Sequence, residues 1–126
     1  MEVVAAVIER DGTVLICQRK GGRHALKWEF PGGKVEPEED FRDALARELR
    51  EELSIDARIG EELGFNEVRY GSGPAISLRF YHVTDFTGEP LNREFERIVW
   101  ETKSRLPQYD FLEGDVEFVQ KLAAGV

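Results

Sequence analysis

The segment GKVEPEEDFRDALARELREELSI, residues 33–55, decides how this chain folds. It has no Gly or Pro between Glu38 and Leu53, and Pro37 stands where a missing backbone N–H costs little, so we predict a helix over 38–53. At about 100° per residue, one arc of this helix gathers the apolar side chains Phe41, Ala44, Leu45, Leu49 and Leu53. We expect that arc to face the body of the protein.

Three carboxylates lie on or beside the same arc. Glu48 and Glu52 fall about 20° on either side of Phe41, and Glu51 lies at the border of the arc. Like charges at this spacing repel, and partial removal from water raises the cost. Protonation of a carboxylate, or binding of a hard divalent cation, would remove this electrostatic cost. Mg²⁺ in particular bridges carboxylates to phosphates. The alternative is a solvated acidic face, but such a face would not coincide with the leucine stripe.

Strand patterns flank this helix on both sides. Two β-rich runs, 3–9 and 13–19, are separated by Asp11-Gly12, a dipeptide suited to a tight turn. Two further runs, 63–70 and 75–84, predict a second hairpin.

Three shorter elements complete the prediction. These are an extended segment at 28–30, a strand at 97–100, and a terminal helix at 116–124 with Asp115 as a plausible N-cap. Strands before and after a central helix indicate an α/β layer fold with a mixed sheet.

Composition narrows the class of protein. The 126 residues hold 17 Lys and Arg against 25 Asp and Glu, a net charge of −8, and one cysteine, Cys17. A chain of this length can bury about two thirds of its unfolded surface, so one domain over residues 1–126 is expected. A lone Cys forms no internal disulfide, and no apolar run approaches the roughly 20 residues needed to span a bilayer. We therefore expect a cytoplasmic location and no membrane partner.

The charge also bears on the ligand. An acidic chain is a poor partner for a nucleic-acid polymer, which needs a basic face. Between Glu36 and Glu52, however, eight acids stand against three Arg, so much of the excess is local. This concentration marks the place where a divalent cation is expected to bind and allow an anionic substrate to approach.

Residues 33–55 resemble the Nudix box, G-x(5)-E-x(7)-R-E-U-x-E-E-x-G-U, where U is bulky and apolar. Every fixed polar position agrees, and the one departure is Ser54 where the pattern has Gly. That position is expected to end the helix in a left-handed conformation, at a cost of about 1 kcal/mol for Ser. Two further segments, WEFPGGK at 28–34 and YDFLEGD at 109–115, are similar to the MutT subgroup. The resemblance covers nearly the whole chain and implies the Nudix α/β/α sandwich with a mixed β-sheet.

The resemblance also implies an activity, the hydrolysis of a nucleoside diphosphate linked to another group. For MutT-like members this means cleavage of a nucleoside triphosphate to the monophosphate and pyrophosphate. The implied ligands of Mg²⁺, or of Mn²⁺, are Glu48, Glu51, Glu52 and the carbonyl of Gly32. Glu48 or a later acid would orient or deprotonate the attacking water. A metal held by carboxylates agrees with what phosphoryl chemistry needs.

Two further box residues would support this site. Arg47 would hold the carboxylates in place through its fork of donors. The alternative for Arg47 is a simple surface pair with Glu51. Glu39 would fix the geometry between loop and helix, with complementing of the helix dipole as the alternative.

Residues outside the fixed positions of the box are the candidates for phosphate contacts and for a further acid at the metal site. Arg19 and Lys34 are the candidates for phosphate contacts, and each has an ordinary surface charge as the alternative. The family often supplies a carboxylate just before its last strand, here Glu94 or Glu96, with Glu96 slightly preferred. A rim charge is the alternative for both.

The base pocket is expected near the C-terminus. Phe30 and Phe111 are candidates to contact a base, although either residue type more often lies in a core. Asp115 stands where MutT proteins that cleave 8-oxoguanine nucleotides place Asn. An ionised Asp only accepts hydrogen bonds and suits the amino group of cytosine, whereas a protonated Asp still serves oxidised guanine. Capping of the last helix is the alternative for Asp115.

Three functions are therefore weighed. The first is a MutT-like nucleoside triphosphate pyrophosphohydrolase acting on 8-oxo-dGTP or a cytidine nucleotide. The second is a Nudix hydrolase of a dinucleotide or a nucleoside diphosphate sugar. The third is a non-catalytic nucleotide-binding module, which the complete set of box carboxylates disfavours. The oligomeric state stays open.

Overall fold

A mixed sheet forms the centre of the computed structural model, which describes residues 1–125. β1 (Glu2–Arg10) pairs antiparallel with β2 (Thr13–Gln18) and parallel with β7 (Ile76–Val83). β7 in turn pairs antiparallel with β6 (Glu62–Val68), and β3 (Trp28–Glu29) extends the order to β3-β2-β1-β7-β6. Both predicted hairpins and the mixed sheet are confirmed.

Four further strands complete the β structure. β4 (Gly32–Lys34) pairs with β1, and β9 (Arg97–Thr102) pairs with β2. β5 (Asp56–Arg58) and β8 (Asp85–Thr87) form a separate two-stranded sheet. The strand predicted at 97–100 is therefore longer than expected. The sequence did not predict β4, β5 or β8, because three residues are too few to show a strand period.

The central helix, α1 (Phe41–Leu53), begins three residues later than predicted. The side chain of Asp40 caps it by accepting hydrogen bonds from the N–H groups of Arg42 and Asp43. At the other end Ser54 adopts the expected left-handed conformation, with φ 57°. The apolar arc is confirmed, since it contributes the fully buried side chains Ala44, Leu45, Leu49 and Leu53.

The terminal helix, α2 (Glu113–Ala123), begins three residues before the predicted start. Leu112 occupies the N-cap position, so the prediction that Asp115 caps this helix is wrong. A 3₁₀ helix, η1 (Lys103–Gln108), lies between β9 and α2, where the sequence predicted no element. No helix within residues 1–125 is long and apolar enough to cross a membrane.

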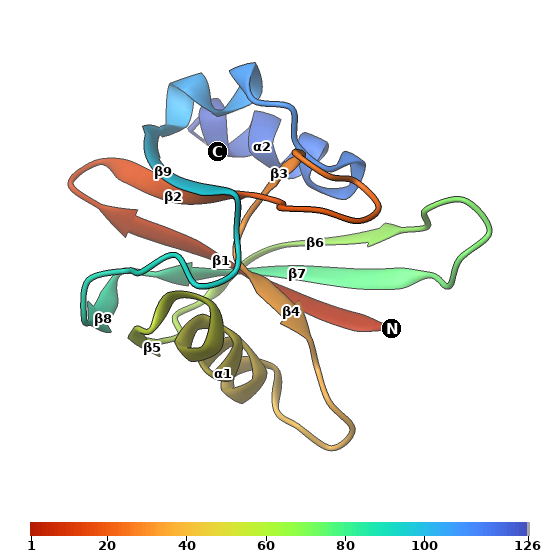
Figure 1. Ribbon diagram of the computed structural model, residues 1–126, viewed down its shortest axis with the longest axis horizontal. Coiled ribbons are helices and arrows are strands. Elements are labelled where there is room, and N and C mark those ends of the chain that lie inside the picture. Colours follow the sequence, from red (N-terminus) through yellow and green to blue (C-terminus); the bar gives the residue numbers. More distant parts are fainter. Residues whose placement is uncertain (126) are drawn as a thin grey trace.

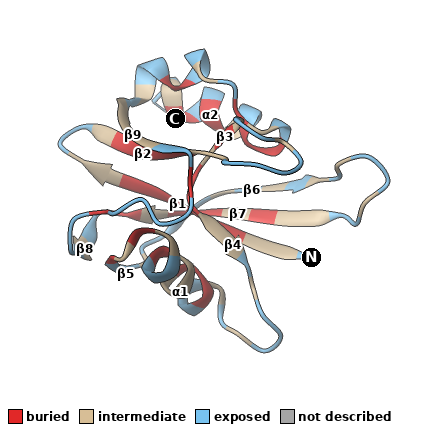
Figure 2. Cartoon of the chain, in the orientation of Figure 1, coloured by how far each residue is buried: buried red, intermediate tan, exposed pale blue. Residues whose placement is uncertain are grey.

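The elements form three layers, with α1 on one side of the sheet and α2 with η1 on the other (Figure 1). β1 alternates between the two faces, as the strand period requires. Val4 and Ile8 join the cluster under α1, whereas Ala5 and Val7 join the cluster under α2. Buried residues follow the central strands and the inner sides of both helices (Figure 2). The α/β/α sandwich is confirmed.

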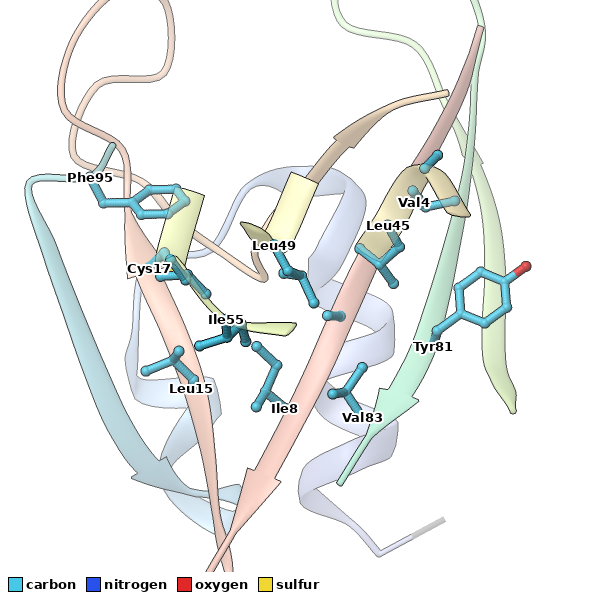
Figure 3. Close-up of a cluster of buried hydrophobic side chains, with 13 residues drawn as sticks. Val4, Ile8, Leu15, Cys17, Leu45, Leu49, Ile55, Tyr81, Val83 and Phe95 are labelled. Carbon is cyan, nitrogen blue, oxygen red and sulfur yellow. The ribbon is translucent and has the colours of Figure 1, made fainter. Parts of the chain in front are cut away.

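The cluster under α1 fixes where the helix presents its polar groups. Figure 3 shows Leu45 and Leu49 of α1 and Val4 and Ile8 of β1 among the side chains of this cluster. Because the leucines are held against the sheet, the neighbouring positions on the same arc are held close to β4, which packs on α1.

Candidate active site

The inner carboxylates of α1 lie against β4. The N–H of Gly32 donates to Oε1 of Glu52 at 3.2 Å. A Cβ at Gly33 would lie only 2.5 Å from the carboxyl carbon of Glu48, so a larger residue there would displace this carboxylate. The Glu48 side chain is 15% exposed and that of Glu51 is 59% exposed, as expected for a border position.

These acids lie where a negative charge is costly. Burial raises the pKa of Glu52 to about 9, and the carboxylates of Glu48 and Glu29 act in the same direction. Burial also raises the pKa of Glu48, although Arg47 partly offsets this. The cluster therefore favours a bound proton or a bound cation.

Arg47 lies at the centre of a network of acids. Its Nε and Nη2 atoms donate to the two oxygens of Glu39 at 2.8 and 3.0 Å. Its Nη1 atom donates to Glu48 at 3.0 Å and lies 3.5 Å from Oε1 of Glu51. The carbonyl of Lys34 accepts a further bond at 3.1 Å. The pair with Glu51 is thus the longest of several hydrogen bonds, and the Arg47 guanidinium lowers the pKa of Glu39 to about 2.

The carboxylates of Glu48, Glu51 and Glu52 form an acid cluster, and a cavity of about 440 Å³ adjoins it at Glu52. It is lined by Glu52, Gly32 and Gly33 from the acid cluster and its loop, and by apolar residues of the sheet such as Leu78. Its volume falls within the range of small-molecule sites, about 300 to 1,000 Å³. Other lining residues that the sequence predicted as site residues are Arg19, Lys34, Phe30 and Asp115.

Arg19 provides positive charge inside this cavity. Its Nη1 atom donates to Glu29 at 3.1 Å, and its Nε is buried without a hydrogen-bond partner among the described residues. The Arg19 side chain as a whole is 38% exposed, so the outer part of its guanidinium can donate to an incoming phosphate oxygen. Lys34 is exposed at the edge of the same cavity.

Asp115 is 5% exposed, although it carries an ionisable group. Burial raises its pKa to about 8, the Glu29 carboxylate adds to the shift, and a backbone hydrogen bond from Phe30 opposes it. The group is therefore largely protonated at neutral pH and can both donate and accept a hydrogen bond. A protonated Asp115 is thus not restricted to accepting hydrogen bonds, as the ionised group would be.

The two candidate aromatic residues are placed differently. Both belong to the cluster under α2, with ring centroids 5.5 Å apart. Phe30 also lines the cavity, whereas Phe111 does not. The geometry leaves Phe30 as the candidate for contact with a base.

The two acids before β9 are also separated by the fold. Glu94 lines the cavity, and its charge contributes to the raised pKa of Glu52. Glu96 lies outside the lining, and its N–H donates to the carbonyl of Gln18. The placement favours Glu94 over Glu96, the reverse of the preference taken from the sequence.

A model of the NUDIX domain matches residues 1–122 of the chain. The chain belongs to the Nudix family. The prediction made from residues 33–55 is confirmed, and the Nudix box residues are those that form the network between α1 and β4. Glu39, Arg47 and Glu48 meet in the structure although the box spreads them over the loop and the helix.

Relatives within the Nudix family are similar over most of their length. A CTP pyrophosphohydrolase of Escherichia coli is 44% identical, over 98% of this chain and 92% of the relative. A putative 8-oxo-dGTP diphosphatase 2 of Mycobacterium tuberculosis is 38% identical, over 96% of this chain and 86% of the relative. The crystal structure of a MutT NUDIX hydrolase from Burkholderia pseudomallei superposes with a TM-score of 0.84, at 28% identity and over 96% and 95% of the two chains.

Nudix hydrolases generally need a divalent metal ion. Within residues 1–125 no three His, Cys, Asp or Glu side chains already form a closed metal cluster, and Arg47 engages both Glu48 and Glu51. The groups offered are all hard oxygen donors gathered beside one cavity. Such a donor set fits Mg²⁺, which keeps several waters and binds through a few protein oxygens.

Glu29 and Tyr70 are among the cavity residues that were not predicted from the sequence. Glu29 stands between the buried aromatic residues Trp28 and Phe30, and a charged residue in so apolar a segment was a signal that could have marked it. Tyr70 ends the run 63–70 that was predicted as a strand, and nothing local distinguishes it.

Proposed function

We propose that this Nudix hydrolase, acting as one domain over residues 1–126, cleaves nucleoside triphosphates to the monophosphate and pyrophosphate with Mg²⁺. The observation that carries the proposal is a cavity lined both by Glu52, one of the clustered acids of α1, and by a buried hydrogen-bonding group, Asp115. The first suits a polyphosphate and the second suits a base. The relatives named above are described as acting on CTP and on 8-oxo-dGTP, which supports a nucleoside triphosphate substrate. Such a substrate also agrees with a cytoplasmic location.

The proposed metal site lies between α1 and β4. The groups that would hold Mg²⁺ are Glu48, Glu51, Glu52 and the carbonyl of Gly32. When bound, the ion neutralises charge on the phosphate oxygens. Arg47 would keep the carboxylates in position.

Other groups would act on the substrate and the water. Arg19 and Lys34 would bind phosphate oxygens, Arg19 through the exposed part of its guanidinium in the cavity. Glu48 or Glu94 would orient the attacking water and accept its proton. We prefer Glu94 to Glu96 for this additional role because only Glu94 reaches the cavity.

The protonated state of Asp115 widens the range of bases that fit. Its O–H can donate to N3 of cytosine while its carbonyl oxygen accepts from N4, and it can equally pair with O6 and N7–H of 8-oxoguanine. When unmodified guanine presents this same N7 and O6 edge, both atoms are acceptors. The carbonyl oxygen of Asp115 then faces N7, which has no hydrogen to donate.

A panel of nucleoside triphosphates tests this proposal. We expect Mg²⁺-dependent release of pyrophosphate, with kcat/KM for dCTP and 8-oxo-dGTP exceeding that for dGTP by about tenfold, since a mismatched pair costs about 1–3 kcal/mol. Preferred cleavage of a dinucleotide or a nucleoside diphosphate sugar would instead support the second candidate activity. Binding of nucleotides without any release of phosphate would identify a non-catalytic module.

The pH dependence of kcat/KM tests the role of Asp115. As the pH rises through about 8, Asp115 ionises and loses its donor. We expect kcat/KM for 8-oxo-dGTP to fall by about fivefold or more between pH 7 and 9.5, because a required hydrogen bond becomes a repulsion. Asp115→Asn keeps both donor and acceptor at every pH, so the ratio of variant to wild type should rise over this range. A constant ratio would contradict the assignment.

The same ionisation is linked to stability. The pKa of Asp115 is about 8 in the folded state against 3.8 in its ordinary environment, so folding takes up a proton between these values. The free energy of unfolding should therefore decrease as the pH rises from about 4 to about 8. Asp115→Asn should weaken that decrease, which thermal unfolding at pH 5 and pH 8 measures.

A further inference from the structure

The start of α2 is fixed by a side chain from another element. Leu112 holds the N-cap position and makes no side-chain cap bond. The N–H of Gly114, in the first turn, donates instead to the hydroxyl of Tyr70 at 3.0 Å. Asn66 of β6 donates from Nδ2 to the carbonyl of Gly114, also at 3.0 Å. Both polar backbone groups of Gly114 are thus held from β6 and the residues that follow it, and the helix start depends on them.

Gly114 is fitted to this contact. A Cβ at this position would lie 2.8 Å from the Tyr70 hydroxyl and 3.1 Å from Cγ1 of Val68. Any larger residue would push Tyr70 away from the helix. The residue that follows Gly114 is Asp115, so the bond from Tyr70 acts one peptide unit from the group proposed to contact the base.

Tyr70 also touches the loop between β2 and β3. Its ring lies 4.8 Å from the ring of His24, at an interplanar angle of 54°. The guanidinium of Arg23 lies close to Gly71, where a Cβ would be 3.0 Å from it. Tyr70, His24 and Asp115 all line the cavity. Tyr70 therefore joins the loop that carries Arg19 at its start to the helix that carries Asp115.

We propose that Tyr70 is a positioning residue that sets base selectivity by anchoring the first turn of α2 and so placing the Asp115 carboxyl group against the base. This inference rests on the proposed function and extends it. No side chain at the start of α2 caps this helix, because the N-cap residue, Leu112, makes no side-chain hydrogen bond. The hydroxyl of Tyr70, on the other side of the cavity, holds the helix start instead. Loss of the hydroxyl should loosen the position of Asp115 while the apolar walls and the acid cluster stay in place.

Tyr70→Phe removes the hydroxyl and keeps the ring against His24. We expect the ratio of kcat/KM for dCTP or 8-oxo-dGTP to that for dGTP to fall by about three- to tenfold, the range of one lost hydrogen bond. The change should appear mainly in KM, because the acid cluster is untouched. Asn66→Ala removes the other bond to Gly114 and should lower the same ratio.

Tyr109→Phe is the matched control. Its hydroxyl donates to Glu101 at 2.7 Å, and Tyr109 does not line the cavity. This variant also loses one tyrosine hydrogen bond, so we expect comparable stability to that of Tyr70→Phe but an unchanged selectivity ratio.

A double-mutant cycle with Asp115→Ala separates positioning from a general structural role. If Tyr70 acts through Asp115, Tyr70→Phe should not change the ratio further once Asp115 is replaced. An unchanged ratio in the single variant, an equal loss with every base, or the same shift in both backgrounds overturns the inference while wild-type turnover upholds the proposed function. A wild type that releases no pyrophosphate from any nucleoside triphosphate overturns the proposed function first, and this inference with it.

Discussion

Glu52→Gln is expected to lower kcat for pyrophosphate release by at least about 100-fold at saturating Mg²⁺. Glu52 lies against the loop of Gly32 and accepts a hydrogen bond from its N–H at 3.2 Å. An amide oxygen carries no net charge, so it binds a hard cation much more weakly than a carboxylate. Loss even of a residue that only supports a metal ligand typically costs 10- to 100-fold, and loss of a ligand should cost more. Initial rates over a Mg²⁺ titration measure the effect.

The substitution should separate activity from stability. The amide oxygen of Gln can still accept from the N–H of Gly32, and removal of a buried acid relieves its repulsion with Glu48 and Glu29. We therefore expect the midpoint of thermal unfolding in EDTA to stay level or to rise. Lower stability together with lower activity would mean that Glu52 has a structural role instead.

Asp43→Asn is the matched control for this variant. Asp43 lies on the same helix, is exposed, and points away from the acid cluster. We expect its turnover to remain within about twofold of wild type, because a surface charge on the far side of α1 has little effect on the cavity. Full turnover by Glu52→Gln would show that its carboxylate is not a metal ligand.

The sequence predicted those elements that depend on interactions between residues close together in the chain. The β-rich runs of β1, β2, β6 and β7 and the apolar arc of α1 depend on neighbouring residues, and the structure confirms them. The start of α2 was misplaced because its anchor is not local. Gly114 lies before the predicted helix, yet in the structure its N–H, in the first turn of α2, donates to Tyr70, 44 residues away.

The site shows the same division between local and distant causes. The box acids could be placed on one helix face from spacing alone. The choice between Glu94 and Glu96 could not, because Asn92 accepts hydrogen bonds from the N–H groups of Glu94 and Phe95 and so sets the loop that brings Glu94 to the cavity. The protonated state of Asp115 was also out of reach, since it depends on burial and on Glu29 across the cavity.

Replacement of Arg47 should have the second large effect. Its guanidinium joins Glu39 on the loop to Glu48 and Glu51 on the helix and also binds the carbonyl of Lys34. We expect Arg47→Ala to lower kcat/KM by about 10- to 100-fold and to raise the Mg²⁺ concentration needed for half-maximal rate, because the carboxylates lose their common support. Thermal unfolding should occur at a lower temperature, since Glu39 and Glu48 then lose a partly buried hydrogen-bond partner.

Arg47→Lys tests whether charge alone is sufficient. An ammonium group keeps the charge but cannot donate in one plane to both oxygens of Glu39 while also reaching Glu48. We therefore expect Arg47→Lys to recover less than a third of the activity that Arg47→Ala loses. Arg50→Lys, at an exposed position of the same helix paired with Asp56, should stay near wild type. Wild-type activity in Arg47→Lys would show that the site needs only a positive charge here, and the fork of donors would then have no part in holding the metal ligands.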